Sequence, residues 1–408
     1  MSDNKKPNIR FKGYSDDWEQ RKLIDVCDYV DYRGKTPTKT DSGFFLVTAK
    51  NVKDGYIDYG ASQEYISEDD YEEVMHRGKP EIGDVLITTE APCGNVAQVN
   101  RADIALAQRI IKYRGQSNIV DNTYLKYYLL SPEFQNILNA KSSGGTVKGI
   151  KGSILHQQEI KYPKYEEQFK IGSYFNNLDN LITLHQRKYD KLQTLKKAML
   201  EKMFPKNGSN VPEIRFKRFT DAWERRKLNE ITDVRDGTHD SPKYVQEGHP
   251  FITSKNVSNG FINYDDVQYV TDEDYEEINK RSKVDVHDIL MGMIGTIGNL
   301  ALIRKEPDFA IKNVALIKYT GDIEYKYLYQ ALQVDCVMSQ LSTGMDGGTQ
   351  KFVSLKKIRE LDIPFPEECE QKKIGAYFSN LDTLITLHQR ELEKLQNIKK
   401  AMLEKMFV

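Results

Sequence analysis

Hydrophobic residues recur in alternating steps of four and three along two long stretches of the chain, residues 168–204 and 371–407. Both stretches lack proline and are rich in Leu, Lys, Gln, Ala and Met, which favour the α-helix. Such steps are typical of helices that pack along a partner helix. The seam positions predicted to face that partner are Ile171, Phe175, Leu178, Ile182, His185, Leu192, Met199, Ile374, Phe378, Leu381, Ile385, His388, Leu395 and Met402.

The two stretches are copies of one another, identical at 28 of 37 positions. At 1.5 Å per residue each helix would be roughly 55 Å long, which is more than one small domain can bury. We therefore expect the two helices to bury each other. Two unrelated amphipathic surface helices are the alternative, but unrelated helices need not share their polar residues as well.

The duplication continues outside the helices, because residues 7–23 match residues 212–228 and place Trp18 and Trp223 at equivalent positions. The predicted fold is α+β: two tandem globular domains separated by a pair of long antiparallel coiled-coil helices, with pseudo-two-fold symmetry. The predicted parts are a first globular domain over 1–165, a helix over 166–205, a linker with a second lead-in segment over 206–224, a second globular domain over 225–367 and a helix over 368–408.

The globular parts have diverged but remain collinear. Residues 44–59 and 250–264 each predict a strand, a turn and a second strand. Residues 65–74 and 269–278 each predict a helix, with Ser67 or Thr271 as its N-cap. Residues 82–99 and 286–303 predict a strand, a glycine-containing turn and a strand, and residues 121–146 and 323–349 an aromatic-rich helix running into a glycine-rich loop.

The net charge of −1 excludes a global basic field, so any positive charge for nucleic acid must be local or must come from other subunits. The four cysteines form no CxxC pair, which argues against zinc ribbons and a disulfide framework and fits a reducing cytoplasm. Neither a signal peptide nor a membrane span is expected.

Catalytic motifs are degenerate. Gly34-Lys35-Thr36 resembles the end of a P-loop, but Tyr29 stands where its first glycine belongs. Asp308 with Glu324 and Lys326 resembles the acid pair and lysine of many nucleases, yet the first half has no equivalent set. His185 and His388 share one seam position, where a hydrogen-bonded histidine at the seam edge is favoured over a metal ligand. No metal site is predicted.

Two glycine-rich loops, residues 142–148 and 343–351, combine glycine, threonine and lysine. Glycine lets backbone N–H groups approach a phosphate closely, although a flexible connection would have the same composition. Lys50-Asn51 and Lys255-Asn256 follow predicted strands; lysine suits guanine or phosphate and asparagine suits adenine, with a turn-stabilising asparagine as the alternative.

Taken together, these features resemble the specificity subunit of a Type I restriction–modification system over essentially the whole chain. The resemblance rests on the two-fold repeat, on the LITLHQR and KKAMLEKMF segments of both helices, and on the Trp-Glu-x-Arg-Lys-Leu lead-in to each globular part. Lys-Asn-Val and the Gly-Gly-Thr segments add to it.

The resemblance implies that each globular part is a target recognition domain that reads one half of a split double-stranded DNA sequence. The helices would set the unread gap and dock the methyltransferase subunits, usually two, which the restriction–translocase subunits join. The chain itself would have no active site, and S-adenosylmethionine, ATP and Mg²⁺ would act on the partner subunits. Such systems methylate DNA and defend the host.

The loops at 32–37 and 236–242, and the segments at 88–90 and 292–294, differ between the halves and are expected to face DNA. The full set of candidate DNA contacts is Arg33, Lys35, Lys50, Asn51, Thr88, Thr89, Gly144, Gly145, Thr146, Lys148, Thr238, His239, Lys255, Asn256, Met293, Thr296, Gly347, Gly348, Thr349 and Lys351. A self-contained DNA-modifying or DNA-cleaving enzyme and a scaffold without a DNA role are the competing hypotheses.

Overall fold

The computed structural model describes residues 6–34, 36–144, 146–258, 260–342 and 351–408. The chain forms two compact units: unit 1 comprises Met1–Gln186 with Arg390–Val408, and unit 2 comprises Arg187–Gln389. Each unit therefore contains one globular part, one end of the first long helix and the opposite end of the second. Both units mix helix and sheet, which confirms the predicted α+β class. No helix among the described residues is long and apolar enough to cross a membrane.

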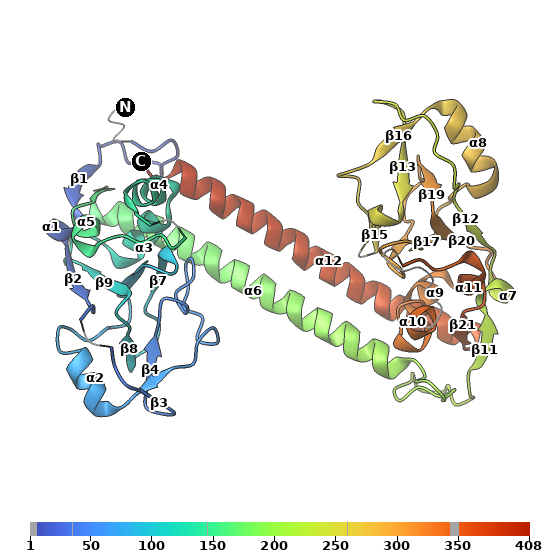
Figure 1. Cartoon of the computed structure of the whole chain (residues 1–408), viewed down its shortest axis with the longest axis horizontal. Coiled ribbons are helices and arrows are strands. Elements are labelled where there is room, and N and C mark those ends of the chain that lie inside the picture. The colour runs from blue at the N-terminus through green and yellow to red at the C-terminus, as the bar shows by residue number, and fades with distance from the viewer. Residues whose placement is uncertain (1–5, 35, 145, 259, 343–350) are drawn as a thin grey trace. The chain divides into compact units, whose positions relative to one another are not determined.

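Unit 1 begins with a short strand and ends its globular part where the first long helix starts (Figure 1). Its elements are β1 (Glu19–Lys22), α1 (Leu23–Val26), β2 (Cys27–Asp31), β3 (Lys39–Thr40), β4 (Phe44–Val47), β5 (Tyr65–Ile66), α2 (Glu68–Val74), β6 (Val85–Thr89), β7 (Cys93–Gln98), β8 (Ile104–Leu106), β9 (Ile110–Gly115), α3 (Asn122–Leu130), α4 (Pro132–Lys141), α5 (Gly152–His156), β10 (Glu159–Tyr162) and the start of α6 (Tyr165–Met203).

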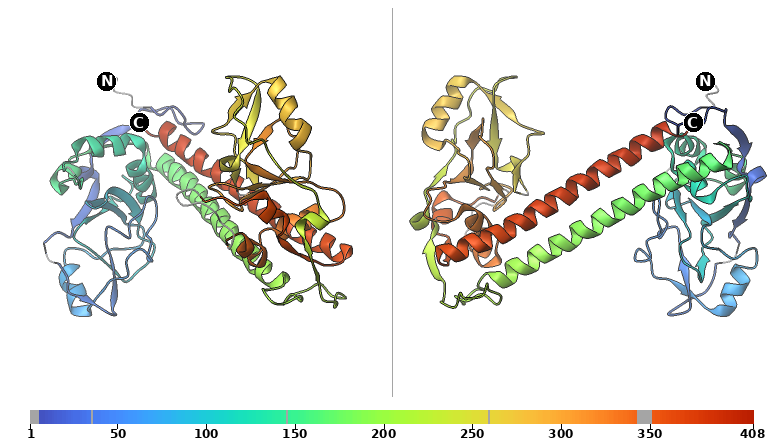
Figure 2. Two further views of the ribbon diagram at one scale, coloured as in Figure 1. Left: turned by 45° about the vertical axis from the view of Figure 1, so that its right-hand side comes forward. Right: turned by 180° about the vertical axis from the view of Figure 1, so that it is seen from behind.

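Two four-stranded sheets make up this globular part, in the orders β2-β9-β6-β7 and β3-β5-β4-β8, and β1 pairs separately with β10. The first sheet is antiparallel, whereas β4 and β8 run parallel. One hydrophobic core lies between the sheets, and a second joins β6 and β9 to α3 and to the start of α6. Two further views show α3 and α4 beside that end of α6 (Figure 2).

Unit 2 repeats this plan with a different set of short strands. Its elements are β11 (Glu224–Lys227), α7 (Leu228–Ile231), β12 (Val234–Asp236), β13 (His249–Thr253), the 3-10 turn η1 (Ser254–Asn256), β14 (Val257–Ser258), β15 (Phe261–Ile262), β16 (Gln268–Val270), α8 (Asp272–Ser282), β17 (Ile289–Gly292), β18 (Leu300–Leu302), β19 (Ala310–Lys312), β20 (Val314–Ile317), α9 (Tyr325–Ala331), α10 (Asp335–Ser342), α11 (Leu355–Arg359), β21 (Asp362–Phe365) and α12 (Glu368–Lys405). Its main sheet has the order β12-β20-β17-β18, which matches β2-β9-β6-β7 strand for strand.

The long helices are antiparallel within each unit, as predicted. In unit 1 the Phe175 ring lies 5.6 Å from that of Phe407, and Asp179 Oδ1 lies 2.6 Å from Lys399 Nζ. In unit 2 the equivalent ion pair joins Lys196 Nζ to Asp382 Oδ1 at 2.7 Å. Residue numbers rise along one helix as they fall along the other, so each unit pairs the start of one helix with the end of its partner.

The predicted seam is buried unevenly. Ile171, Phe175 and Leu178 are buried, but the globular part shares in covering them, because the Tyr127 ring of α3 lies 5.0 Å from that of Phe175. Ile374, Phe378, Leu381 and Ile385 are buried in the same way in unit 2. The remaining seam positions are only half-buried, and they are Ile182, His185, Leu192, Met199, His388, Leu395 and Met402.

A glycine near the start of each long helix allows this close packing. A Cβ atom at Gly172 would lie 3.0 Å from Tyr124 N, and one at Gly375 would lie 2.9 Å from Tyr327 N. The distance at Gly375 is shorter than side chains tolerate and that at Gly172 is at the limit, so a larger residue would shift α12 relative to α9, and would crowd α6 against α3. The glycine that both helix copies share therefore has a packing reason.

One predicted helix is in fact two. The segment at 121–146 was expected to form a single aromatic-rich helix, but α3 ends at Leu130 and α4 begins at Pro132. Proline lacks the N–H that would continue α3 and is favoured in a first helical turn, where the Ser131 side chain accepts a hydrogen bond from Phe134 N–H. The Ser67 and Thr271 N-caps are present as predicted.

Candidate nucleic-acid interface

A carboxylate and a guanidinium meet at the end of β2 in unit 1. Arg33 Nε lies 3.0 Å and 2.9 Å from the two oxygens of Asp31, and Arg33 Nη2 donates to Asp31 Oδ2 at 2.5 Å. The backbone N–H of Arg33 also donates to Asp31 Oδ1, at 3.1 Å. Burial alone would raise the pKa of Asp31, but the hydrogen bonds and the charge of Arg33 outweigh it and lower that pKa. The guanidinium is therefore held in one orientation.

Arg109 lies across from this pair, in the tight turn between β8 and β9. Its carbonyl oxygen accepts hydrogen bonds from the N–H and the hydroxyl of Thr89, at 2.9 Å and 3.2 Å. Its guanidinium is half exposed, with Nε 3.4 Å from Glu90 Oε2. The backbone of Arg109 is fixed while the outer end of its side chain remains open to solvent.

Backbone hydrogen bonds join the two ends of the glycine-rich loop of unit 1. Ser143 and Gly149 exchange both of their hydrogen bonds at 2.9 Å, and Ile150 N–H donates to Thr89 O at 2.9 Å. Gly144 has a φ of 122°, and a Cβ atom there would lie 2.1 Å from Val147 O. Only glycine fits this turn, and the loop exposes Thr146 and Lys148.

Arg33, the turn that contains Arg109 and the glycine-rich loop line one cleft of about 380 Å³. Its lining residues are Arg33, Thr89, Glu90, Gln108, Arg109, Ser143, Val147, Gly149, Ile150 and Lys151. Sequence reasoning found Arg33, Thr89 and the loop but missed Gln108, Arg109 and Lys151, which belong to no motif. Strand pairing places them there, because Asp31 at the end of β2 lies opposite Ile111 of β9.

The equivalent corner of unit 2 has a different chemistry. Asp236 lies opposite Ala315 in the matching strand pair, and its carboxylate contacts His239 Nε2 at 2.8 Å and the guanidinium of Arg281. His239 Nδ1 lies 2.7 Å from Asn313 Oδ1. The hydrogen bonds with Asn313 and with Asp236 raise the pKa of His239. The same sheet edge thus presents a held imidazole beside the Arg281 guanidinium in unit 2, and the Arg33 guanidinium in unit 1.

Two of the candidate contacts are turn-stabilising residues instead. Asn51 is fully buried: its Oδ1 accepts hydrogen bonds from the N–H and hydroxyl of Thr48, and its Nδ2 donates to the carbonyls of Asp58 and Ser62. Asn256 makes the same four kinds of hydrogen bond in unit 2. Each amide has used its bonding capacity inside the fold, so the expectation that these residues read adenine is wrong.

Three further candidates are also buried. Thr88 accepts a hydrogen bond from Asn95 N–H at 3.0 Å, Thr89 is bound to Arg109 O, and the Met293 side chain lies in the core of unit 2. At these three positions, the difference between segments 88–90 and 292–294 is therefore one of core packing and turn support, whereas Glu90 remains in the cleft. The expectation of direct DNA contacts by these three side chains is corrected accordingly.

The remaining candidates lie at or near the surface. Lys50, Lys148, Lys255 and Lys351 are exposed, and the Lys255 ammonium lies 2.7 Å from Asp266. Thr238 and Thr296 are half-buried, and the Thr296 hydroxyl donates to Ser254 O at 2.5 Å. Lys35, Gly145, Gly347, Gly348 and Thr349 lie outside the described residues.

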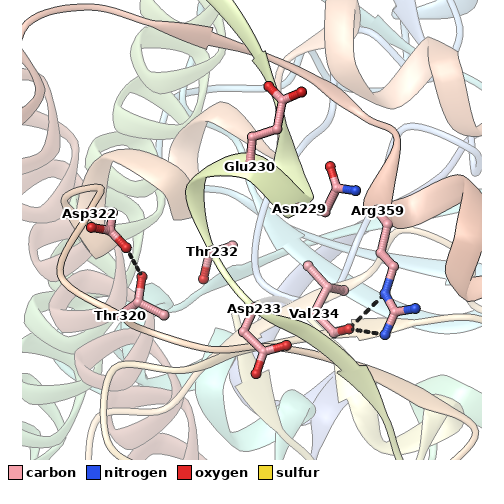
Figure 3. Close-up of a pocket in the computed structure, with 8 residues that line it drawn as sticks. All are labelled: Asn229, Glu230, Thr232, Asp233, Val234, Thr320, Asp322 and Arg359. Atoms are coloured by element: carbon pink, nitrogen blue, oxygen red, sulfur yellow. Dashed lines mark hydrogen bonds between the residues drawn. The ribbon is translucent and has the colours of Figure 1, made fainter.

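A pocket of about 510 Å³ in unit 2 is unsuited to a nucleic acid (Figure 3). Glu230, Asp233 and Asp322 bring carboxylates to its wall. Its one arginine, Arg359, donates through Nε and Nη2 to Val234 O, at 2.9 Å and 2.7 Å. Carboxylates repel phosphates, so this pocket is not part of the interface.

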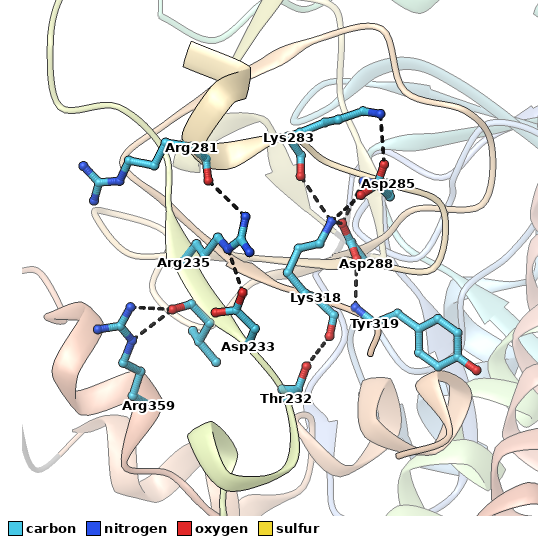
Figure 4. A network of polar contacts seen from close by, with 11 residues as sticks. Thr232, Asp233, Arg235, Arg281, Lys283, Asp285, Asp288, Lys318, Tyr319 and Arg359 are labelled. Atoms are coloured by element: carbon cyan, nitrogen blue, oxygen red, sulfur yellow. Dashed lines mark hydrogen bonds and ion pairs between the residues drawn. The ribbon is translucent and has the colours of Figure 1, made fainter. Parts of the chain in front are cut away.

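A network of hydrogen bonds and ion pairs next to that pocket supports the main sheet (Figure 4). Lys318 Nζ lies 2.6 Å from both Asp285 and Asp288, and the Asp288 side chain is almost completely buried. In unit 1 the equivalent Asp84 pairs with Arg114 at 2.6 Å and with Lys112 at 3.3 Å. These buried carboxylates are neutralised by cations of their own unit, which marks them as structural.

The residues of the nuclease-like motif are not assembled into one site. Asp308 Oδ1 lies 2.6 Å from His249 Nδ1, whereas Glu324 N–H donates to the Gln371 side chain of α12 at 3.0 Å. Among the described residues, no group of three His, Cys, Asp or Glu side chains could hold a metal ion.

Comparisons with known proteins identify the family of the chain. Residues 15–194 and 220–397 each match the family described as the Type I restriction modification DNA specificity domain. The chain is 23% identical over 408 residues to the Type I restriction enzyme MjaVIII specificity subunit of Methanocaldococcus jannaschii, covering 95% of this chain and 91% of that protein. It is 20% identical over 329 residues to the EcoBI specificity subunit of Escherichia coli, covering 74% and 68%.

Among solved structures, the Type I restriction-modification system S subunit from M. genitalium has the same fold. The TM-score is 0.70 at 16% sequence identity, and the match covers 99% of both chains. Since the family's domain matches both repeats and most of the chain, this protein belongs to the family of Type I restriction–modification specificity subunits, with two target recognition domains.

Proposed function

We propose that this chain is the non-catalytic DNA-recognition subunit of a Type I restriction–modification complex. The recognition domain of each unit reads one half of a split double-stranded target, and the long helices set the length of the unread gap. The observation that carries the proposal is the contrast inside the repeat. The ion pairs between the long helices recur in both units. The polar groups held by Asp31 at the end of β2 and by Asp236 at the end of β12 differ.

The helices also offer matched surfaces for partner subunits. Leu181 and Leu184 of α6 are 44% and 46% exposed, and their equivalents Leu384 and Leu387 of α12 are 43% and 51% exposed. Exposed leucines at equivalent helical positions are typical of protein-binding sites. Because one such pair lies in each unit, two copies of one partner would find the same surface twice. We assign these surfaces to two methyltransferase subunits, which the restriction–translocase subunits join.

In this scheme the chemistry takes place on the partners. S-adenosylmethionine would bind the methyltransferase subunits, and ATP with Mg²⁺ would act in the restriction–translocase subunits. The complex would work in the cytoplasm, where the chromosome is. The chain contributes the choice of DNA sequence and the assembly of the complex.

Adenine-methylation mapping of the host genome, with and without this gene, tests the proposal. We expect methylation at two short specified blocks around a fixed gap, which is lost on deletion and restored by the intact gene. Methylation that is independent of the gene would contradict the proposal. So would methyl transfer by the purified chain alone.

The docking surfaces have their own test. Leu181→Asp should remove one of two methyltransferase subunits from the purified complex, as should Leu384→Asp, and the double variant should remove both. Mass measurement of the intact complex would show this. Full retention of both subunits by the double variant would show that they dock elsewhere.

A further inference from the structure

We propose that Arg33 reads a guanine in the half-site bound by unit 1, and that Asp31 is the positioning residue that aims its guanidinium. The inference deepens the proposed function and rests on it. It assigns a base class and a pair of residues to one recognition domain. The equivalent aspartate of unit 2, Asp236, holds an imidazole as well as a guanidinium.

The free edge of the Arg33 guanidinium is the one that guanine requires. Asp31 occupies the Nε–Nη2 side through three contacts of 2.5 to 3.0 Å. Within the described part of the chain, no hydrogen bond engages Nη1. The Nη1 hydrogens and the outer Nη2 hydrogen therefore point away from the carboxylate as a fork. A guanine presents two acceptors, O6 and N7, along its major-groove edge, and a two-donor fork matches them.

A second arginine, Arg77, holds the backbone at the end of β2. Arg77 Nη1 donates to the carbonyl oxygens of both Asp31 and Arg33, at 3.1 Å and 3.0 Å. The strand end is thus tied by side-chain and backbone hydrogen bonds at once. A side chain that is already ordered loses less entropy on binding, which favours a specific contact over a loose electrostatic one.

The groups around Arg33 suit the DNA phosphates on either side of the base that Arg33 would read. Arg109 and Lys151 share its cleft, and Ser143, Val147 and Gly149 form another wall. Glu90 is the one carboxylate among the residues that line this cleft, and it lies beside Arg109. Cations with exposed N–H donors favour phosphates, which position a protein on DNA without reading its sequence.

Unit 2 provides an internal comparison. Both ring nitrogens of His239 are already engaged, Nε2 by Asp236 and Nδ1 by Asn313. An imidazole in this state cannot offer two parallel donors to a guanine. Asp236 also holds the guanidinium of Arg281. The two half-sites should therefore differ at the base that faces His239 in unit 2 and Arg33 in unit 1.

Selection from a randomised duplex library by the full chain in complex with its methyltransferase subunits tests the inference. The unaltered complex should enrich a split sequence with a fixed guanine in one block. Arg33→Ala should reduce the preference for that guanine by about 5- to 150-fold, the usual range for a bidentate base contact, and leave the second block unchanged. Arg33→Lys, which keeps the charge but loses the fork, should lose the same preference.

Asp31→Asn separates positioning from charge. It removes the acceptor that holds Nη2, so the guanine preference should weaken, and the salt dependence of binding should stay near that of the unaltered complex. Arg101→Ala is the matched control, because this exposed arginine of the same unit lies over the Phe45 and Tyr59 rings, 5.9 Å and 5.6 Å from their centroids. Its selected sequence should be unchanged.

The outcomes are distinguishable. If the unaltered complex selects no split sequence, the proposed function fails. If it does, but Arg33→Lys keeps every base preference, Arg33 contacts phosphate and the inference is overturned. A uniform loss of affinity across all sequences for Arg33→Ala, with a shallower salt dependence, would overturn it as well. A matching loss in the second block would contradict the assignment to unit 1.

Discussion

The two units share a framework but not a surface. In unit 1, Arg10 donates from Nε and Nη2 to Glu167 at 2.7 Å and 2.8 Å, and in unit 2 Arg215 donates to Glu370 at the same two distances. Both glutamates are fully buried at the start of a long helix. Where the lead-in segment meets the helix, the two copies share this arginine–glutamate ion pair.

The ends of β2 and β12, at the edges of the two main sheets, differ in the groups that they hold. Asp31 and Asp236 occupy equivalent strand positions, but the first holds Arg33 and the second holds His239 together with Arg281. The duplication preserved the residues on which the fold and the pairing of the long helices depend. The groups that the shared aspartate presents to solvent have changed. The following experiments test how far this division holds.

The largest effect is expected from lengthening both helices. Copies of residues 187–193 inserted before Arg187, and of residues 390–396 inserted before Arg390, keep the heptad phase within each unit. Seven residues add about 10 Å, close to three base pairs. Methylation mapping should show both specified blocks unchanged and the gap about three base pairs longer.

The same heptad in one helix only serves as the control. It shifts ion pairs such as Asp179–Lys399 out of register and should abolish methylation rather than move it. An unchanged gap after the double insertion would show that the helices do not set spacing.

Removing a framework carboxylate should be the next largest effect. Glu370→Gln leaves the Arg215 charge buried without its counter-charge, and we expect a loss of about 3 kcal/mol in the free energy of unfolding of unit 2. Glu370 also accepts a hydrogen bond from Trp223 Nε1 at 3.1 Å, whereas Trp18 Nε1 has no partner among the described residues. Glu167→Gln should therefore cost about 1 kcal/mol less.

Each unit contains one of the chain's two tryptophans, so urea unfolding can follow the units separately. A Trp18→Phe background reports on unit 2, and a Trp223→Phe background reports on unit 1. Equal losses for the two glutamine variants would mean that the Trp223 hydrogen bond adds nothing measurable.

A buried lysine should make the stability of unit 1 rise as the pH becomes alkaline. Burial lowers the pKa of Lys126 from 10.5 to about 8, with Asp179 opposing that shift and Lys399 adding to it. Between these two values the unfolded chain binds more protons than the folded one, so stability rises with pH. The cost of the buried charge is fully present below pH 8, and its relief amounts to at most about 3 kcal/mol.

Lys126→Met should flatten this rise, measured as the free energy of unfolding of unit 1 at pH 7.5 and 9.5. Asp179 keeps Lys399 as a partner in the variant, at 2.6 Å. Unit 2 has Tyr329 at the equivalent position and provides the unaltered comparison. A persistent slope in the methionine variant would assign the pH dependence to another group.

The smallest effect is expected from the paired ions of the helices. Lys399→Met and Lys196→Met each remove one partly buried ion pair, and each should lower the stability of its own unit by about 1 kcal/mol. Losses that differ by more than this amount would show that the framework is less symmetric than its contacts indicate.

Much of the architecture could be predicted from local patterns. The heptads located α6 and α12 to within three residues at each end, the Ser67 and Thr271 caps located α2 and α8, and the repeat gave the matching order of elements. Periodicity and capping act between residues that are close in sequence, so they can be read without a structure. The family resemblance was confirmed for the same reason, since it rests on these repeated segments.

The candidate interface was predicted only in part. Arg33 and the loop at 142–148 were identified, but Asn51, Thr88 and Met293 were assigned to a surface from which the fold removes them. A polar residue after a strand looks the same in sequence whether it faces solvent or closes a turn. Only the hydrogen-bond partners of Asn51, up to eleven residues away, distinguish the two cases.

The amino-acid sequence by itself therefore determined the duplicated plan, the two long helices, the α+β class and the family. The tertiary structure alone decided which side chains share the corner. Asp31 and Arg33 are separated from Arg109 by more than seventy residues, and they line one cleft because β2 pairs with β9. Strand pairing depends on the burial of a whole sheet face rather than on any local motif. This is why Arg109, beside the Asp31–Arg33 pair, became visible only in the folded chain.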